Sequence, residues 1–152
     1  MKFWRITTKK YALDRTCYGA RSEGGRWNPI GFPVLYAGAT VEICALEKFV
    51  HLAGTIYPPL VLVTVEIPDD PSIIIQPAIG DLPADWADLP APESTQIFGR
   101  DILVKHQALA MLIPSAIIPE ALNAVINADH PAYDRIKLSI EREFRFDARM
   151  RK

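Results

Sequence analysis

Thirteen prolines, spread along a chain of 152 residues, constrain the fold more than any other feature of the sequence. Proline lacks a backbone N–H and its ring clashes with the preceding helical turn, so it ends or kinks a helix. Long uninterrupted helices are therefore disfavoured, and we expect short helices joined to short strands. Because 49% of the residues are hydrophobic, the chain has enough apolar material for one core, and we treat residues 1–152 as a single domain.

The charge balance argues against nucleic acid as the main ligand, because 17 basic and 18 acidic residues give a net charge of −1. The one basic cluster, Arg149 to Lys152, is expected to be a solvated tail. No apolar run approaches the ~20 residues of a membrane span, and the N-terminus lacks a signal-peptide pattern. Cys17 and Cys44 make no disulfide framework, and Cys44 is expected to be buried. We therefore expect a cytoplasmic protein with no membrane partner.

Short apolar runs bounded by glycine and proline predict the strands. In the last predicted strand, at about residues 138–146, Arg142 interrupts an alternating apolar face. We therefore expect Arg142 to have a partner, to lie at a sheet edge or to reach into a cleft. The predicted strands cover residues 3–6, 34–37, 60–67, 72–76, 108–113 and about 138–146, with loops over 16–31 and 77–93.

Three helices complete the prediction, over residues 40–52, 94–107 and 119–126. The first has Thr40 as its N-cap and ends at Gly54, and the second starts at Ser94 or Thr95. Together these elements predict one mixed α/β (α+β) domain with a bent, partly antiparallel sheet.

Glu47 is a polar residue at an apolar position of the first predicted helix. At about 100° per residue, Ile43, Leu46 and Val50 share one face, and Glu47 points between the directions of Ile43 and Val50. Burying an unpaired carboxylate is costly, so Glu47 needs a partner or a ligand. A structural ion pair, a carboxylate that reaches solvent and a functional role all stay open.

A glycine-rich segment, Gly24-Gly25-Arg26-Trp27-Asn28-Pro29, precedes the strand that carries Tyr36. Paired glycines let a backbone approach a ligand closely, and an arginine there can bind phosphate or carboxylate oxygens. A Gly-Gly turn with an exposed arginine is the alternative. The segment matches neither the P-loop nor the GxGxxG fingerprint.

Two further polar sites follow apolar segments. Ser115 lies outside any GxSxG motif, so we expect it to hydrogen-bond a ligand or the backbone rather than to act as a nucleophile. The turn from Ile126 to Pro131 fits either an Asx turn or a ligand contact. No metal is expected, because His51, His106 and His130 are too far apart in the sequence for a ligand motif. His51 and His106 are expected on helix surfaces.

These segments, in this order and spacing, resemble the RES domain, a family named for its Arg, Glu and Ser residues. The resemblance covers the chain from Phe3 to about Phe146, and one departure is Ala128, where the family has proline. The matching stretches are Trp4-Arg5-Ile6, Gly25-Arg26-Trp27-Asn28, Val34-Leu35-Tyr36-Ala37, Ala45-Leu46-Glu47, Ile113-Pro114-Ser115-Ala116, and Asn127 with His130-Pro131.

The resemblance implies a fold similar to ADP-ribosyltransferases and an enzyme that cleaves the nicotinamide–ribose bond of NAD+. The family's members are toxins of bacterial toxin–antitoxin pairs, and the implied partner is an Xre-like antitoxin with a helix-turn-helix. NAD+ is then a consumed substrate, and no cofactor is expected. A homo-oligomer and a toxin–antitoxin hetero-oligomer both stay open.

Site residues are carried over from the same resemblance. Arg26, Tyr36 and Glu47 are the implied catalytic residues, with Glu47 stabilising an oxocarbenium-like ribose. Arginines suit the pyrophosphate, Tyr36 would contact the nicotinamide mononucleotide half, and Ser115 would bind the ribose or the nicotinamide amide. The residues implied to bind NAD+ are Arg5, Arg26, Tyr36, Ser115 and Asn127.

Two other functions remain open. Transfer of ADP-ribose to a protein would use the same arginine, tyrosine and glutamate. A catalytically silent binding module would instead pair Glu47 with Arg26 inside the fold.

Overall fold

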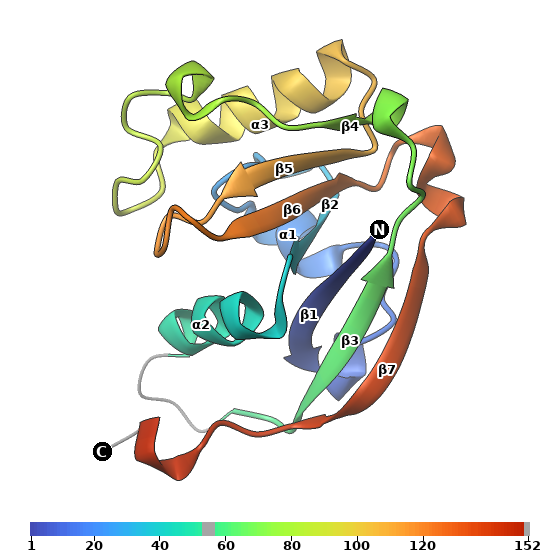
Figure 1. Cartoon of the computed structure of the whole chain (residues 1–152), viewed down its shortest axis with the longest axis vertical. Helices are drawn as coiled ribbons and strands as arrows, with labels where there is room; N and C mark the ends of the chain where they lie inside the picture. The colour runs from blue at the N-terminus through green and yellow to red at the C-terminus, as the bar shows by residue number, and fades with distance from the viewer. Residues whose placement is uncertain (53–56, 151–152) are drawn as a thin grey trace.

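A seven-stranded mixed sheet forms the centre of the computed structural model, which describes residues 1–52 and 57–150 (Figure 1). The strand order is β4-β5-β6-β2-β1-β3-β7, and every neighbouring pair is antiparallel except β4 with β5. The mixed α/β domain is therefore confirmed. The strands are β1 (Lys2–Thr8), β2 (Val34–Gly38), β3 (Leu60–Glu66), β4 (Ile74–Ile75), β5 (Ala110–Pro114), β6 (Leu122–Asn127) and β7 (Lys137–Phe144).

The sheet bends where β2 meets β1. These strands share a single register pair, Trp4 with Gly38, whereas β1 pairs with β3 along its whole length, from Lys2 to Thr8. Figure 1 shows β5 and β6 lying across the view, whereas β1, β3 and β7 are steeply inclined to them. The sheet thus has two sections, β4-β5-β6-β2 and β1-β3-β7, which diverge on either side of that one pair.

The helices α1 (Tyr18–Glu23), α2 (Val41–His51) and α3 (Glu93–Lys105) lie outside the sheet. Leu103 of α3 packs on one face of the first section, with Met111 and Val125. Cys44 of α2 packs on the second section, with Ile6. None of the described helices is long and apolar enough to cross a bilayer. A third cluster joins the two sections and includes Phe3, Leu35, Val65 and Ala124.

Helix α2 confirms the predicted helix after Thr40. The Thr40 hydroxyl oxygen accepts a hydrogen bond from the Ile43 N–H at 3.3 Å, as an N-cap does. Ile43 and Cys44 are buried, but Val50 is 49% exposed, so the predicted apolar face was wrong at that position. The predicted stop at Gly54 lies outside the described residues.

Other local predictions were wrong for reasons of length and pairing. Helix α1, of six residues, lies inside the predicted loop over 16–31, and it is too short to show a helical repeat. The predicted helix over 119–126 is instead strand β6, because β2 and β5 pair with it on both sides. The predicted strand over 72–76 is reduced to the two residues of β4.

Helix α3 begins one residue before the predicted start. Its N-cap is Pro92, which has no side-chain cap. Ser94 is not the cap, because its hydroxyl donates to the Asp85 carboxylate at 2.7 Å. Thr95 is not the cap either, since its hydroxyl donates to the Pro92 carbonyl.

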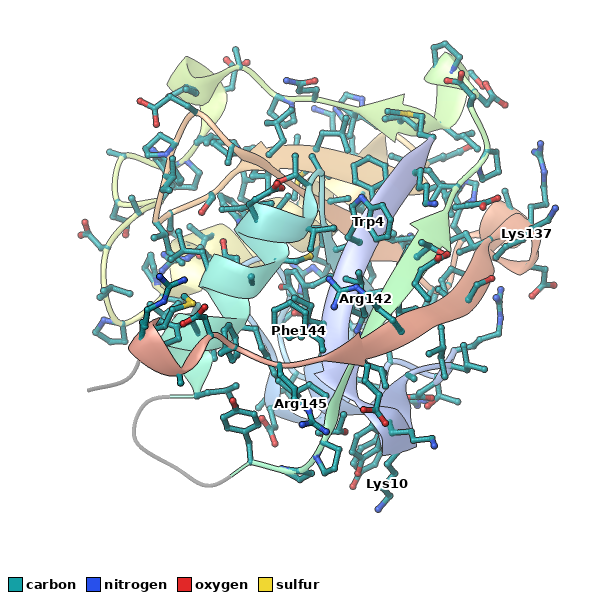
Figure 2. All side chains as sticks on the ribbon, turned by 60° about the horizontal axis from the view of Figure 1, so that its bottom comes forward. Trp4, Lys10, Lys137, Arg142, Phe144 and Arg145 are labelled. Carbon is teal, nitrogen blue, oxygen red and sulfur yellow. The ribbon has the colours of Figure 1, made fainter. Side chains whose placement is uncertain are left out.

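Strand β7 forms one edge of the sheet (Figure 2). A β-bulge interrupts its pairing with β3: Val63 faces Ile140, whereas the adjacent Leu62 faces Arg142. The bulge breaks the predicted alternation, so Ile140 is 43% exposed while Phe144 is buried. Arg142 is exposed, with its guanidinium carbon 5.7 Å from the centre of the Phe144 ring. Of the three expected surroundings, the structure thus shows the sheet edge.

Candidate active site

Helix α2 brings Glu47 against the beginning of β6. The close approach depends on Gly38 at the end of β2, where a Cβ atom would lie 2.8 Å from Ile43 Cγ2 and 2.9 Å from Cys44 Sγ. Only a residue without a side chain lets the helix lie this near the strand. Asn123 is the residue of β6 that pairs with Gly38, and Glu47 reaches it from the helix.

The Glu47 carboxylate is half-buried and is held through one oxygen. The Ser115 hydroxyl donates to Oε1 at 2.9 Å, and the Asn123 amide donates to the same atom at 2.7 Å. Among residues 1–52 and 57–150, no cation forms an ion pair with Glu47 and no group hydrogen-bonds Oε2. The inward position is confirmed, and the pair with Arg26 is not formed.

Ser115 starts the turn between β5 and β6 and is 1% exposed. Its oxygen accepts hydrogen bonds from the Ile117 and Ile118 N–H groups, at 3.0 and 3.3 Å. With the bond to Glu47, its one donor and two lone pairs are all used within the protein. A hydrogen-bonding role toward the backbone is confirmed, while contact with ribose or nicotinamide stays a prediction.

The loop before β2 is organised around the buried Asn28. Its amide donates to three carbonyls of the surrounding chain, and its oxygen accepts the Tyr36 hydroxyl proton at 2.7 Å. The Tyr36 oxygen also accepts from the Trp27 N–H at 3.0 Å. A Cβ atom at Gly25 would lie 2.6 Å from that oxygen, so this glycine admits the tyrosine. The close approach that the glycine permits is therefore made by the protein itself.

Tyr36 lies on the same face of the sheet as the Glu47 carboxylate. Tyr36 and Gly38 are two residues apart on β2 and therefore point to one face. Asn123 pairs with Gly38, which makes it a diagonal neighbour of Tyr36 at roughly 7–8 Å. Burial raises the pKa of Tyr36 well above its ordinary value, so the group is a neutral phenol.

Arg26 is half-buried and fixes a distant segment. Its Nη1 donates to the carbonyls of Trp86 and Asp88, at 2.8 and 2.9 Å. It therefore ties the predicted surface connection over 77–93, which turns near Trp86 as expected, to the loop before β2. Its positive charge also acts on the Tyr36 hydroxyl.

Arg5 follows the one residue of β1 that pairs with β2, so it lies where the two sections diverge. Its Nη1 donates to the Tyr11 carbonyl at 3.4 Å, and burial lowers the pKa of its guanidinium. Burial and then the charge of Arg5 lower the pKa of Lys48 on α2. Arg5 thus lies close enough to act electrostatically on the helix that carries Glu47.

Asn127 does not join the Glu47 cluster, which consists of Glu47, Ser115 and Asn123. It lies four residues after Asn123 on the same strand, which is about 13 Å along the chain. Its oxygen accepts from the Asp129 N–H at 3.0 Å, which confirms the Asx turn. Its role in binding NAD+ stays a prediction. His51 and His106 are exposed at the ends of helices, as predicted.

Residues 2–147 match the RES domain family. The chain belongs to the RES domain family. A relative from Sphingobium sp., named "Prs ADP-ribosylating toxin", is 36% identical to this RES domain over 97% of this chain and 95% of its own length. Proteins named "Toxin Res" from Yersinia enterocolitica and Pseudomonas putida are 32% and 34% identical, each over at least 99% of both chains.

A solved structure shares the fold. It is the M. tuberculosis MbcT–MbcA toxin–antitoxin complex, in which one chain superposes on this RES domain with a TM-score of 0.69 at 19% identity. The match covers 94% of this chain and 82% of that chain. The likeness shows that the fold of this chain also occurs in another protein.

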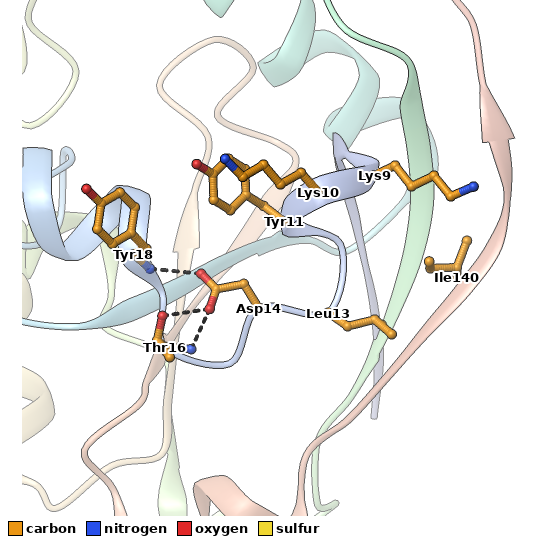
Figure 3. A pocket seen from close by; sticks show the side chains of 8 residues that line it. All are labelled: Lys9, Lys10, Tyr11, Leu13, Asp14, Thr16, Tyr18 and Ile140. Atoms are coloured by element: carbon orange, nitrogen blue, oxygen red, sulfur yellow. Dashed lines mark hydrogen bonds between the residues drawn. The ribbon is translucent and has the colours of Figure 1, made fainter.

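Figure 3 shows a pocket of about 620 Å³ in this RES domain. Glu47, Ser115 and Asn123 are not among the residues that line it. Parallel rings of Tyr11 and Tyr18 border it, with their centres 6.5 Å apart. Its carboxylate, Asp14, accepts three hydrogen bonds from Thr16 and the Tyr18 N–H, which lower the pKa of Asp14 despite some burial. The pocket is lined by Lys9, Lys10, Tyr11, Leu13, Asp14, Thr16, Tyr18 and Ile140, and none of these is a predicted site residue.

Asn123 is absent from the predicted site residues of the RES domain. The sequence predicts a helix over residues 119–126, and a helix does not place Asn123 on one face with Val125 and Asn127 as a strand does. Read as a strand, the same residues would show two amides on one face, which is a recognisable signal. Asn28 lies in the glycine-rich segment before β2, but no sequence spacing predicts that its amide oxygen accepts the hydrogen bond of the Tyr36 hydroxyl.

Proposed function

We propose that this RES domain is the toxin of a toxin–antitoxin pair and cleaves the nicotinamide–ribose bond of NAD+. The observation that supports this best is the Glu47 carboxylate. Two neutral donors hold one of its oxygens, and within the described residues no cation pairs with it. A carboxylate fixed in this way keeps its negative charge for a ligand. The relatives named "Toxin Res" support the toxin assignment, and the relative named an ADP-ribosylating toxin supports NAD+ as the substrate class.

The proposed reaction breaks the bond between ribose C1′ and the nicotinamide nitrogen. Both electrons of that bond leave with nicotinamide, which departs as a neutral molecule, and positive charge develops on C1′ and the ring oxygen. Glu47 stabilises this charge more in the transition state than in the ground state. Water then adds to C1′ and loses a proton, which yields ADP-ribose.

The remaining predicted residues would bind the substrate. Arg5 and Arg26 would hold the pyrophosphate, because guanidinium groups donate to phosphate oxygens in a forked geometry. The neutral Tyr36 would lie beside the nicotinamide mononucleotide half, on the face that it shares with Glu47. Ser115 and Asn127 would complete the site, each with its side-chain oxygen already in a hydrogen bond within the protein.

Transfer of ADP-ribose to a protein is the second candidate. It is favoured by the name of the relative from Sphingobium sp., an ADP-ribosylating toxin. The same residues serve both reactions, and only the acceptor that attacks C1′ differs. Nicotinamide release without modified protein indicates hydrolysis, whereas a product that requires phosphate indicates phosphorolysis. Labelled protein from NAD+ indicates transfer.

Nicotinamide release by the Glu47→Gln variant tests the proposal. Glutamine keeps the shape, and its amide oxygen can still accept from Ser115 and Asn123, so we expect a near-parental melting temperature. Because the negative charge is lost, release should fall at least about 100-fold. Glu42→Gln is the matched control on the exposed face of the same helix, and it should keep full activity.

No release by the parent chain, with phosphate and candidate protein acceptors present, would contradict the proposal and favour a silent binding module. Parental activity in Glu47→Gln would contradict the role of Glu47 alone.

The proposed partner is an antitoxin of the helix-turn-helix type, as the family resemblance implies. The M. tuberculosis complex is a structure of a toxin with its antitoxin, which supports a direct contact between two proteins here. Copurification with the product of the neighbouring gene, with loss of NAD+ cleavage in the complex, is the expected result. A chain that is active and harmless when expressed alone would count against it.

A further inference from the structure

Asn123 is a fixed polar group that the proposed reaction does not use. It lies at the second position of β6, where it pairs with Gly38 of β2 on one side and Ile113 of β5 on the other. Strands on both sides hold its backbone in place. Its amide donates to Glu47 Oε1 at 2.7 Å, and no other hydrogen bond of this side chain is found among the described residues.

Two donors on one oxygen limit how the Glu47 carboxylate can turn. The Ser115 hydroxyl is itself oriented by two backbone N–H groups, and Asn123 is held by the sheet. Rotation of the carboxylate would therefore lose both bonds, each of which is strengthened by the negative charge. The second oxygen, Oε2, is left pointing in one direction.

We propose that Asn123 is a positioning residue for Glu47, which fixes the carboxylate through Oε1 so that Oε2 faces the ribose of NAD+. This role rests on the proposed function. Asn123 acts through Glu47 and not by contact with the substrate.

Few titratable groups surround this contact. Neither Asn123 nor Ser115 titrates. Cys44, one turn earlier on α2, interacts electrostatically with Glu47, but burial raises the pKa of its thiol to about 12, so it is neutral near pH 7. Lys48 is the next residue on the helix, and burial together with the positive charge of Arg5 lowers its pKa. A carboxyl placed at position 123 would therefore interact first with Glu47.

Asn123→Asp gives a test with a distinctive pH dependence. Two carboxyl groups at this distance share one proton, and the protonated aspartic acid donates to Glu47 as the amide does. When the pH rises and this proton is lost, two anions face each other. We expect NAD+ cleavage by Asn123→Asp to fall at least about 10-fold with rising pH, over a range in which the parent keeps its activity.

Asn123→Ala removes the donor without adding a charge. We expect kcat to fall about 10- to 100-fold at every pH, the effect of losing a hydrogen bond to a charged group. KM should change much less, because Asn123 does not touch the substrate. Gln76→Glu is the control for an amide-to-acid change at an exposed position, and it should leave both parameters unchanged.

The outcomes separate the two proposals. No NAD+ cleavage by the parent contradicts the proposed function. Cleavage by the parent together with a parental kcat in Asn123→Ala overturns only the positioning role, as does an equal loss in Asn123→Asp at all pH values. If Asn123→Asp does not fold, the alanine variant decides. A change in the ¹³C shift of the Glu47 carboxyl in Asn123→Ala, and none in Gln76→Glu, is expected independently of catalysis.

Discussion

At the scale of single residues, the protein itself satisfies most polar atoms around Glu47. Ser115 uses its donor and both lone pairs within the chain, and the buried amide of Asn28 uses donor and acceptor alike. Oε2 of Glu47 accepts no hydrogen bond from the described residues. This carboxylate oxygen therefore keeps its acceptor capacity for a ligand or for solvent.

The thiol of Cys44 makes stability depend on pH. Burial raises its pKa to about 12, whereas a thiol in an unfolded chain ionises near about 8.5. Above that value the unfolded chain loses a proton that the folded chain keeps, so stability falls as pH rises toward 12. The slope approaches about 1.4 kcal/mol per pH unit for this one group.

Urea unfolding of the parent and of Cys44→Ala between pH 8 and pH 10 measures this effect. We expect the free energy of unfolding to fall less steeply with pH in the variant, although its absolute stability is lower. Identical slopes would show that Cys44 is not responsible.

At the scale of elements, local signals predicted α2 well and β6 badly. Thr40 caps the helix within a few residues of chain, so the helix start is visible in the sequence. Strand β6 depends on β2 and β5, which are distant in sequence, and an apolar run of this length suits either structure. The inward direction of Glu47 was therefore predictable, whereas its partner on β6 was not.

Gly99 sets how closely α3 approaches the loop that carries Arg26. A Cβ atom there would overlap the Trp27 carbonyl oxygen. Since the overlap is with backbone, no side-chain rotation relieves it, and Gly99→Ala should cost about 3 kcal/mol or more. We also expect reduced NAD+ cleavage, because the loop must move.

Thermal unfolding and nicotinamide release test Gly99→Ala beside Gly80→Ala, where a Cβ atom meets nothing within 4 Å. A melting temperature equal to that of Gly80→Ala would refute the tight contact.

At the scale of the whole molecule, Arg15 ties the two ends of the chain together. Its guanidinium donates to the carbonyls of Tyr133 and Ile136, at 2.7 and 2.8 Å, and lies 4.9 Å from the centre of the Tyr133 ring. Arg15 is separated from Tyr133 by 118 positions in the sequence and from Ile136 by 121. Lysine cannot reproduce the fork.

Arg15→Lys should therefore lose about 1–3 kcal/mol of stability in urea unfolding, while KM for NAD+ stays at the parental value. Arg21→Lys, at an exposed position, is the matched control and should be neutral. Equal stability of the two variants would mean that the hydrogen bonds of Arg15 to Tyr133 and Ile136 contribute nothing to the free energy of unfolding.

The interleaved order of the strands has a consequence for synthesis on the ribosome. Both sections of the sheet contain strands from early and late parts of the chain. Strand β3 can pair with β7 only after β7 is synthesised, and Glu47 can bind Ser115 and Asn123 only after those residues are synthesised. An emerging chain adds its segments from the N-terminus onward. The carboxylate is thus translated long before the groups that orient it, so an unfinished chain cannot hold the arrangement that the proposed toxic activity requires.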